Sequence, residues 1–383
     1  MLFFKLKKID WLMVTILVLF MIMSTMLVHS AIAPYAPDFK NYDLKTLMFY
    51  GLGFAVVFGM SIVDYRTLLR YSWYVYGTGS LLLVLVFLFA PEINGARSWF
   101  ELPGGLLFQP AELVKIILIM TTAYLLGKRE GRLLSFRRDV VPITAVTLLP
   151  FLLVLIQPDL GNAIIYLVVL CAMLWIGNTK YSHVLVGLTA FVAFLIVFVT
   201  LFNAYNTQIH DYLADKGKLH WYQRINTFIN PDLASNDAKH QSSYAQIAIG
   251  SGGLTGDGFL QGELKNKRFV PYPYSDSIFV VVGEEFGFVG SSLLMLLYFL
   301  FIYRMIQIAL RCIDKRGAYI IVGIAAMFLF QIFENVGMMI GLMPITGITL
   351  PFISYGGTSL LLNMLCIGLV FSIMLHQEKY KVD

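Results

Sequence analysis

Ten long apolar runs, separated by polar connections, constrain the fold of this chain more than any other feature. They cover residues 11–31, 46–64, 71–90, 110–127, 140–156, 160–177, 182–203, 277–303, 317–343 and 354–376. A helix needs about 20 mostly apolar residues to cross the hydrocarbon core of a bilayer. The runs lack the alternation of apolar and polar residues that a membrane β-barrel requires. We therefore predict an all-α integral membrane protein, a bundle of ten transmembrane helices forming one domain over residues 1–383.

The composition agrees with this fold class. Of the 383 residues, 13% are charged, whereas soluble domains carry roughly 25%. The first run follows three lysines, as the apolar part of a signal peptide does, but it is too long for one and no clear cleavage site follows. We expect it to be retained as the first helix. The three cysteines lie in apolar runs or a basic connection and indicate no disulfide framework.

The basic residues mark one side of the membrane. With ten spans both termini lie on the same side, and the short connections of the other side hold only Lys40, Lys45 and Arg97. The termini side carries Lys5, Lys7, Lys8, Arg66, Arg70, Lys128, Arg129, Arg132, Arg137, Arg138, Lys180, Arg304, Arg311, Lys315, Arg316, Lys379 and Lys381. The positive-inside rule places this side in the cytoplasm. Such scattered charges, without a recognition motif, do not indicate nucleic-acid binding.

The connection 204–276, between the seventh and eighth helices, is the large extracytoplasmic loop of this topology. Its aromatic residues include Tyr205, Tyr212, Trp221, Tyr222, Phe228 and Tyr244. This pattern predicts short helices in the membrane interface, with rings at headgroup depth. A packed outer cap is the alternative, and we expect features of both. The absence of an internal repeat disfavours an inverted-repeat transporter.

Two charged residues open the fourth helix, in the connection 94–115. Gln109 and Pro110 begin the helix, since proline suits a first turn. Glu112 and Lys115 then lie on one helical face. A single charge costs about 2.5–3.5 kcal/mol at the bilayer centre, so the two should pair or line a wet cavity. They form either a structural ion pair or a site for an anionic headgroup, and the intramembrane position favours the site.

Two further connections on the outer side contain turn residues. In the turn 157–162, Asp159 is predicted to cap the sixth helix, although it could also contribute to the rim of a site. The uncharged segment 343–359 contains several helix breakers. Irregular backbone at membrane depth is tolerated only where it lines a protein or water-filled cavity. This segment therefore predicts a cavity near the outer face.

The third polar region runs from 241 to 290. Its glycines, GSGGLTGDG, resemble a phosphate cradle but lack the GK[ST] ending and the preceding strand, so close packing or a turn is the favoured role. Asp276, at the start of the eighth helix, is either an N-cap or a partly desolvated general base. Its position alone favours neither. Glu284 and Glu285 follow within the apolar run, and at least one must face the bundle interior.

Metal binding finds little support in the sequence. His210, His220 and His240 lie in the large loop without metal-ligand spacing, and neither HExxH nor CxxC occurs. We predict exposed loop histidines and no metal site.

The motifs and their order closely resemble the SEDS family (shape, elongation, division and sporulation), which includes RodA, FtsW and SpoVE. The similarity covers nearly the whole chain, and the glycine stretch ending in FLQG looks more like the RodA branch. The matching segments are NGARSWF, QPAELVK, QPDLG, YAQIAIGSGGLTGDGFLQG, DSIFVVVGEEFGFVG and ENVGMMIGLMPITGITLPFISYGGTS.

The resemblance implies a bacterial peptidoglycan glycosyltransferase of the cytoplasmic membrane, with ten transmembrane helices. Such an enzyme polymerises lipid II, an undecaprenyl-pyrophosphate-linked disaccharide peptide, at the outer membrane face during elongation. It implies a class B penicillin-binding protein transpeptidase and elongation-complex membrane proteins as partners. A lipid II flippase and a non-catalytic scaffold of the cell-wall synthesis complex are the alternatives. A flippase should offer a polar path across the full membrane, whereas the ionisable residues here gather towards the outside.

The resemblance also assigns residues. The family's essential acid falls on Asp276. Its QPSExxK element matches Gln109, Pro110, Glu112 and Lys115, with Ala111 replacing serine, and its GARxW element matches Gly95, Ala96, Arg97 and Trp99. Asn162 departs from a common threonine, and the segment 272–275, Tyr-Pro-Tyr-Ser, replaces a His-Thr-like pair before Asp276.

The implied reaction is an inverting glycosyl transfer in which the acceptor C4 hydroxyl displaces a lipid pyrophosphate. Asp276 would be the base, Lys115 and Arg97 would bind pyrophosphate, and Glu112 would orient Lys115. Gln109 and Trp99 would also bind substrate. The other expected lining residues are Asp159, Glu284, Glu285 and Ser354. A divalent cation, Mg²⁺ or Mn²⁺, could share the charge, but no ligand cage is evident.

Overall fold

The computed structural model describes residues 9–35, 39, 41–92, 96–102, 106–129, 131–216 and 236–377, with isolated positions at 219, 222, 225–226 and 229. In these residues nine helices are long and apolar enough to cross a membrane, and α8 is a shorter apolar helix. The ten are α2 (Trp11–Ile32), α3 (Tyr42–Ile62), α5 (Ser72–Phe89), α6 (Pro110–Gly127), α7 (Val141–Ile156), α8 (Leu160–Ile176), α9 (Tyr181–Ala204), α14 (Ile278–Leu310), α15 (Lys315–Met339) and α16 (Gly357–His376). The turn η2 (Phe136–Val140) extends α7 to a spanning length.

The predicted all-α membrane fold is confirmed, and each predicted apolar run overlaps one of these helices. The boundaries differ most in the C-terminal half. Helix α14 continues seven residues beyond the predicted end at 303, to Leu310. Helix α15 ends at Met339 instead of 343, because Gly341 adopts a φ of 80° that a helix does not accept.

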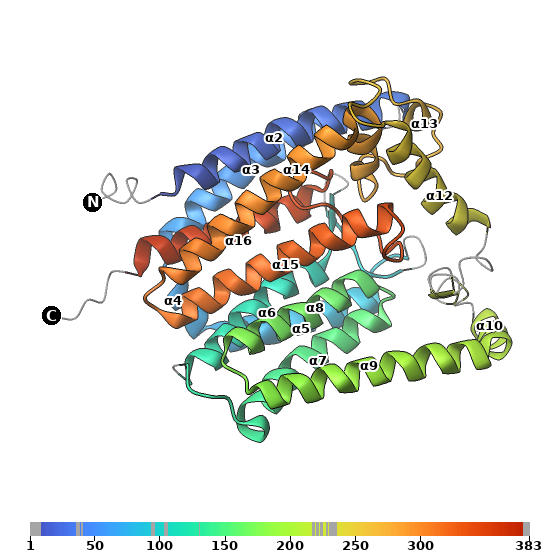
Figure 1. Cartoon of the computed structure of the whole chain (residues 1–383). Helices are drawn as coiled ribbons and strands as arrows, with labels where there is room; N and C mark the ends of the chain where they lie inside the picture. The colour runs from blue at the N-terminus through green and yellow to red at the C-terminus, as the bar shows by residue number, and fades with distance from the viewer. Residues whose placement is uncertain are drawn as a thin grey trace.

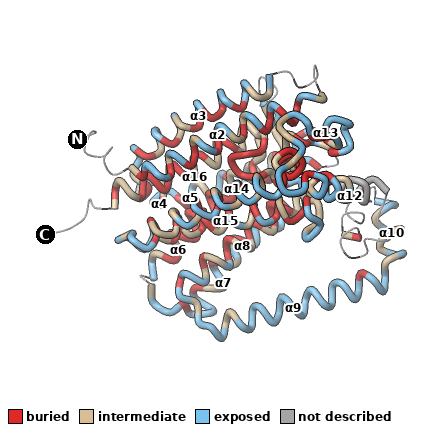
Figure 2. The backbone as a smooth tube through the Cα atoms, turned by 45° about the horizontal axis from the view of Figure 1, so that its top comes forward, coloured by how far each residue is buried: buried red, intermediate tan, exposed pale blue. Residues whose placement is uncertain are grey.

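The helices form an elongated bundle with both termini at one end (Figure 1). Helix α3 packs along α16, α14 contacts both α2 and α15, and α6, α8 and α15 contact one another. Buried residues concentrate on α6, α15 and α16, so these helices form the centre of the bundle. Helix α9 differs, since Phe202 is its one buried residue and most of its length is exposed in Figure 2.

The end of the bundle opposite the termini carries the large loop (Figure 1). The short helices predicted there are present as α10 (Asn206–Asp215), α12 (Asn236–Ser251) and α13 (Glu263–Asn266). Their depth relative to a membrane stays a prediction. Some residues used for the sequence predictions lie outside the described part of the chain, in whole or by their side chains: Lys5, Lys7, Lys8, Lys40, Gly95, His220, Trp221, Phe228, His240, Lys379 and Lys381.

A small antiparallel hairpin at the same end was not predicted. Strand β1 (Phe100–Leu102) pairs with β2 (Leu106–Phe108), with Phe100 opposite Phe108. The Pro-Gly-Gly sequence between the strands is a turn signal, but three residues per strand are too few to show a period of two. The Thr358 hydroxyl donates to the Leu107 carbonyl at 2.6 Å, which ties the hairpin to the start of α16.

The other short elements are η1 (Ala33–Tyr35), which continues α2, and α4 (Tyr65–Arg70), which precedes α5. Helix α4 lies at the end of the bundle that carries the termini (Figure 1). Its N-cap is Asp64, whose carboxylate accepts the Arg66 N–H at 3.0 Å. The polar connections at this end and the large loop lie at opposite ends of the bundle (Figure 1).

The glycine-rich stretch, residues 250–258, forms backbone hydrogen bonds with α14 where that helix is interrupted. Gly287 has φ 60° and ψ −155°, so the helix there is interrupted. The N–H groups of Asp257 and Gly258 donate to the carbonyls of Glu284 and Glu285, both at 3.0 Å. In return the N–H groups of residues 288 and 289 donate to the carbonyls of residues 253 and 254. A Cβ at residue 256 would overlap the Glu285 carbonyl, so close backbone packing, as predicted, is the role of this glycine.

Candidate functional site

Asp276 lies in the turn immediately before α14, at the end of the bundle that carries the large loop. The Asn335 side chain, on α15, holds this turn by donating to the carbonyls of Asp276 and Ile348, both at 2.7 Å. A Cβ at Gly347 would lie 3.9 Å from Asp276 Oδ2. The segment 346–348 therefore packs directly beside the carboxylate.

The Asp276 side chain does not cap α14. Ser277 occupies the N-cap position of α14 and makes no capping bond through its side chain. Asp276 Oδ1 is buried without a hydrogen-bond partner. Burial raises the pKa of this carboxyl from 3.8 to about 6, although the backbone N–H groups of residues 276 and 277 oppose the rise. Of the two roles that the sequence left open, the N-cap is not what the structure shows, and the general base stays a prediction.

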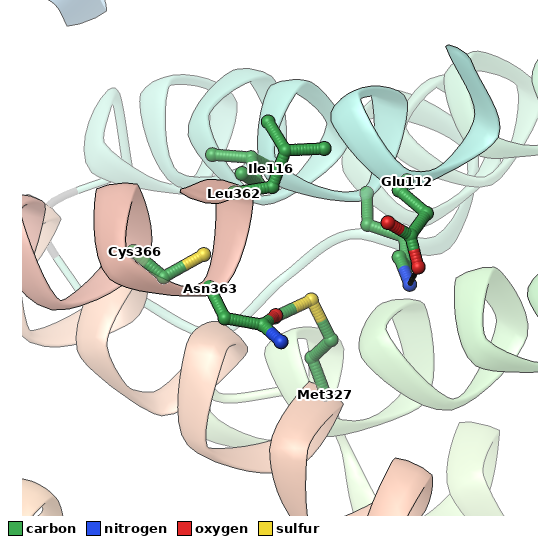
Figure 3. A pocket seen from close by; sticks show the side chains of 7 residues that line it. Glu112, Ile116, Met327, Leu362, Asn363 and Cys366 are labelled. Atoms are coloured by element: carbon green, nitrogen blue, oxygen red, sulfur yellow. Dashed lines mark ion pairs between the residues drawn. The ribbon is translucent and has the colours of Figure 1, made fainter. Parts of the chain in front are cut away.

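Lys115 and Glu112 form an ion pair inside the bundle. Lys115 is 3% exposed, and its Nζ lies 3.9 Å from Glu112 Oε1, one turn earlier on α6. Both side chains line a small pocket between α6, α15 and α16 (Figure 3). Its other lining residues are Ile116, Met327, Leu362, Asn363 and Cys366. The pair therefore faces a pocket, as the site interpretation of these two charges requires.

Asp159 links this pair to the start of α8. Its carboxylate caps α8 by accepting the Asn162 N–H at 3.2 Å, which confirms the predicted cap. The side-chain amides of Asn162 and Gln109 donate to its other oxygen at 2.8 Å and 2.6 Å. Burial raises the pKa of Asp159, while these amides and the ammonium of Lys115 oppose the rise. Gln109, Glu112, Lys115 and Asp159 thus form one polar cluster.

Glu334 belongs to the same cluster and was missed by the sequence analysis. It is fully buried on α15, and neither of its carboxylate oxygens has a hydrogen-bond partner. Lys115 and Asp159 lie within electrostatic reach of it. The signal was present, because an acid inside an apolar run marks a functional site by default. Three carboxylates, those of Glu112, Asp159 and Glu334, therefore surround one ammonium.

The segment 346–348 connects the polar cluster with Asp276. A Cβ at Gly161, in the first turn of α8, would overlap Ile348 and lie 3.2 Å from Thr346 Cβ. The same segment touches Asp276 through Gly347. The cluster and Asp276 are therefore neighbours across the segment 346–348, although no hydrogen bond or ion pair among the described residues joins Lys115 to Asp276 directly.

Three predicted site residues lie outside this cluster. Arg97 is half exposed and pairs with Glu92 at 3.6 Å. Trp99 is partly buried. In the sequence it lies between Arg97 and strand β1. Ser354 Oγ accepts the Leu350 N–H at 2.8 Å and stabilises a turn before α16. Their roles in substrate binding stay predictions.

Glu284 and Glu285 both face the bundle interior, but they anchor the large loop. Glu284 accepts the N–H groups of Leu264 and Lys265 at 2.6 Å and 3.2 Å, at the start of α13. Glu285 forms an ion pair with the fully buried Lys265 and accepts the Ser30 hydroxyl at 2.6 Å. Among the described residues neither glutamate bonds to Asp276, so their predicted place in the site lining finds no contact here.

These features define a polytopic helical membrane protein with a polar site at the end of the bundle that carries the large loop. A desolvated acid and a buried lysine are its chemical groups. The chain belongs to the family of FtsW, RodA and SpoVE, because a family model described as "Cell cycle protein" matches residues 10–379.

Individual relatives support this membership. Stage V sporulation protein E of Bacillus subtilis (strain 168) is 34% identical over 381 residues, which cover 95% of this chain and 96% of that protein. Peptidoglycan glycosyltransferase MrdB of Escherichia coli (strain K12) is 30% identical over 360 residues, 94% of this chain and 93% of that protein. Because the relatives carry different names within the family, a closer kinship with RodA stays a prediction.

Two solved structures share the fold. The crystal structure of the rod shape determining protein RodA of Thermus thermophilus matches with a TM-score of 0.68 and 29% identity, over 96% of this chain and 97% of that one. A chain of a peptidoglycan synthase complex, described as coordinating polymerization and crosslinking, matches with a TM-score of 0.77 and 29% identity. That match covers 97% of this chain and 99% of the other.

Proposed function

We propose that the chain is a peptidoglycan glycosyltransferase that polymerises lipid II into glycan strands at the outer face of the bacterial cytoplasmic membrane. The relatives named "Peptidoglycan glycosyltransferase MrdB" and "Probable peptidoglycan glycosyltransferase FtsW" are each 30% identical over most of this chain. The observation that carries the proposal is the Asp276 carboxylate, desolvated and with a free oxygen, separated by the segment 346–348 from the polar cluster that holds the buried Lys115. We assign this glycosyltransferase activity to cell elongation.

The chemical step needs one base. The acceptor C4 hydroxyl oxygen bonds to the anomeric carbon of the lipid-linked strand, and its proton passes to Asp276. The bond from that carbon to the pyrophosphate breaks, the electron pair leaves with the pyrophosphate, and the configuration inverts. A pKa of about 6 leaves Asp276 ionised at neutral pH, yet makes it more basic than an ordinary aspartate.

Lys115 is the group that we assign to the departing pyrophosphate, with Glu112 orienting its ammonium. Gln109, at the start of the same helix, donates to Asp159 at the start of α8 and so fixes the cluster between the two helices. Because three carboxylates surround one ammonium, binding of an anion requires proton uptake or an accompanying cation. In the described part of the chain no group of three or more His, Cys, Asp or Glu side chains is arranged to hold a metal ion, and we assign no step to Mg²⁺ or Mn²⁺.

A class B penicillin-binding protein transpeptidase and elongation-complex membrane proteins are the partners that we propose. The support is the likeness to a chain of a complex that couples polymerization with crosslinking. We place both termini in the cytoplasm, because the basic connections lie at the end of the bundle that carries the termini.

The test uses purified full-length protein and lipid II. Wild type should form glycan polymer, and Asp276→Asn, shown to be folded, should form none. Glu263→Gln, which removes an exposed carboxylate of the same loop, is the matched control and should polymerise normally. Polymer from Asp276→Asn at the wild-type rate removes Asp276 from the mechanism.

The same preparation separates the other function classes. Transfer of labelled lipid II across vesicles by a wild type that makes no polymer would identify a flippase. Normal cell-wall synthesis in cells that carry only Asp276→Asn would identify a scaffold.

A further inference from the structure

Four tyrosines from three distant segments gather beside the Asp276 turn. Tyr42 begins α3, Tyr272 and Tyr274 precede Asp276, and Tyr355 precedes α16. The Tyr42 and Tyr355 rings stack at 4.3 Å, and Tyr274 meets the two rings edge-on at 5.7 Å and 6.2 Å. The Tyr355 N–H also donates to the Tyr274 carbonyl at 2.8 Å. We call these four residues the tyrosine cluster.

The cluster adjoins the base. Tyr274 lies two residues before Asp276 and within electrostatic reach of its carboxylate. The Phe39 ring also contacts Tyr274 at 4.8 Å and Tyr42 at 5.2 Å. The rings therefore form one aromatic surface beside the Asp276 turn.

Tyr272 is the exposed member, and its backbone is strained. Its side chain is 52% exposed and touches the cluster through one edge contact with Tyr274, at 6.5 Å. Its φ is 48°, a value rare for a bulky residue, and prolines flank it on both sides. Such strain persists only where the surroundings over-determine it, and it is concentrated at binding sites. Packing within the protein does not explain the ring, because half of it is exposed.

The hydroxyl groups of the cluster are available to a ligand. None of the four forms a hydrogen bond with a described residue, and none is a buried group without a partner, so they reach the surface. Burial raises the pKa of Tyr274 and of Tyr355 to about 12, which keeps both hydroxyls protonated as donors. An aromatic body with a polar tip matches a pyranose ring, which has apolar C–H faces and hydroxyls at its rim.

We propose that the tyrosine cluster binds the sugar rings of the glycan strand next to the reaction centre, with Tyr272 stacking on one of them. The proposal deepens the proposed glycosyltransferase function and rests on it. The role that we assign to the tyrosine cluster is to retain the glycan strand between successive sugar additions. We assign it this role because the cluster lies beside the base and not among the charged groups that face pyrophosphate.

The test compares Tyr272→Gly with wild type in lipid II polymerisation. Glycine relieves the positive φ, so the variant should unfold no more easily than wild type. Strand length should fall roughly threefold to tenfold, the size expected for one stacking contact, and more than the rate of lipid II consumption does. Phe269→Ala is the control, because Phe269 is also exposed in the loop but stacks on Tyr244, outside the cluster. Its strands should keep their length.

A binding measurement supports the kinetics. In the Asp276→Asn background, chitotetraose should bind, and adding Tyr272→Gly should weaken that binding by a similar factor. Unchanged strand length and unchanged chitotetraose binding in Tyr272→Gly would overturn the proposal while leaving the glycosyltransferase intact. Weaker membrane insertion, or weaker binding of the transpeptidase, with normal strands would also overturn it. If wild type itself makes no polymer, the proposed function fails first.

Discussion

The raised pKa of Asp276 implies that this acid destabilises the fold that carries it. Burial moves its pKa from 3.8 to about 6. An acid with a higher pKa in the folded than in the unfolded state favours folding in its protonated form. The stability that it contributes is complete below pH 3.8, is lost as the pH rises towards the folded value of about 6, and is absent at neutral pH.

The size of the effect follows from the same values. A rise from 3.8 to about 6 corresponds to about 3 kcal/mol of unfolding free energy. The side chain keeps partial contact with solvent, which makes this value an upper bound. Asparagine imitates the neutral acid at every pH. Asp276→Asn should therefore abolish polymerisation and yet raise stability at neutral pH.

The assay is denaturant unfolding in detergent micelles from about pH 4 to about pH 8. The gain of Asp276→Asn over wild type should be near zero at the acid end and reach its plateau above about pH 6. Glu263→Gln is the control of opposite sign, because its hydrogen bond with Lys267 holds the pKa of exposed Glu263 below its ordinary value. Glu263→Gln should give no gain in stability over wild type. An Asp276→Asn protein no more stable than wild type at neutral pH would refute the reasoning, as would a gain independent of pH.

Polymerisation should slow about tenfold from about pH 7 to about pH 5, because Asp276 becomes protonated, and a flat rate profile would contradict its role as base. Gly256→Ala should destabilise the protein by at least about 1 kcal/mol more than Gly253→Ala in thermal unfolding. Both glycines have positive φ, but only at Gly256 would a Cβ meet backbone, so equal losses would contradict the close packing of Gly256 against α14. Lys265→Met should cost about 3–5 kcal/mol by leaving Glu285 buried and unpaired. Adding Glu285→Leu to Lys265→Met should recover most of that loss. A double variant as unstable as Lys265→Met would contradict the attribution of the loss to the unpaired Glu285.

The helices were predictable because the membrane imposes a length and a composition on each of them. The location of the site was predictable for a related reason. Charges and irregular backbone are costly in lipid, so Glu112, Lys115 and the segment 343–359 mark a protein-lined region from sequence alone. Glu334 obeys the same rule, and it was missed because a single acid hardly changes a strongly apolar run.

The contact partners of individual side chains were less predictable than the positions of the helices and of the site. The spacing of Glu284 and Glu285 shows that at least one faces inward, but not that both bind α13. Arg97 was assigned to pyrophosphate by resemblance, whereas its contact is the nearby Glu92. In each case tertiary packing decides between several acceptable partners, and no local pattern contains that information.

The break in α14 shows how fold and site depend on each other. An intact helix would use the carbonyls of Glu284 and Glu285 for its own next turn, and nothing would remain to bind the glycine-rich stretch. Gly287 releases those carbonyls, and the side chains of the same two glutamates hold α13. The ion pair from Lys265 to Glu285 therefore closes a loop between residues 20 apart, with Asp276 near its middle. A short closed loop loses less entropy on ordering than an open one, so the residues that interrupt α14 also hold Asp276 in place.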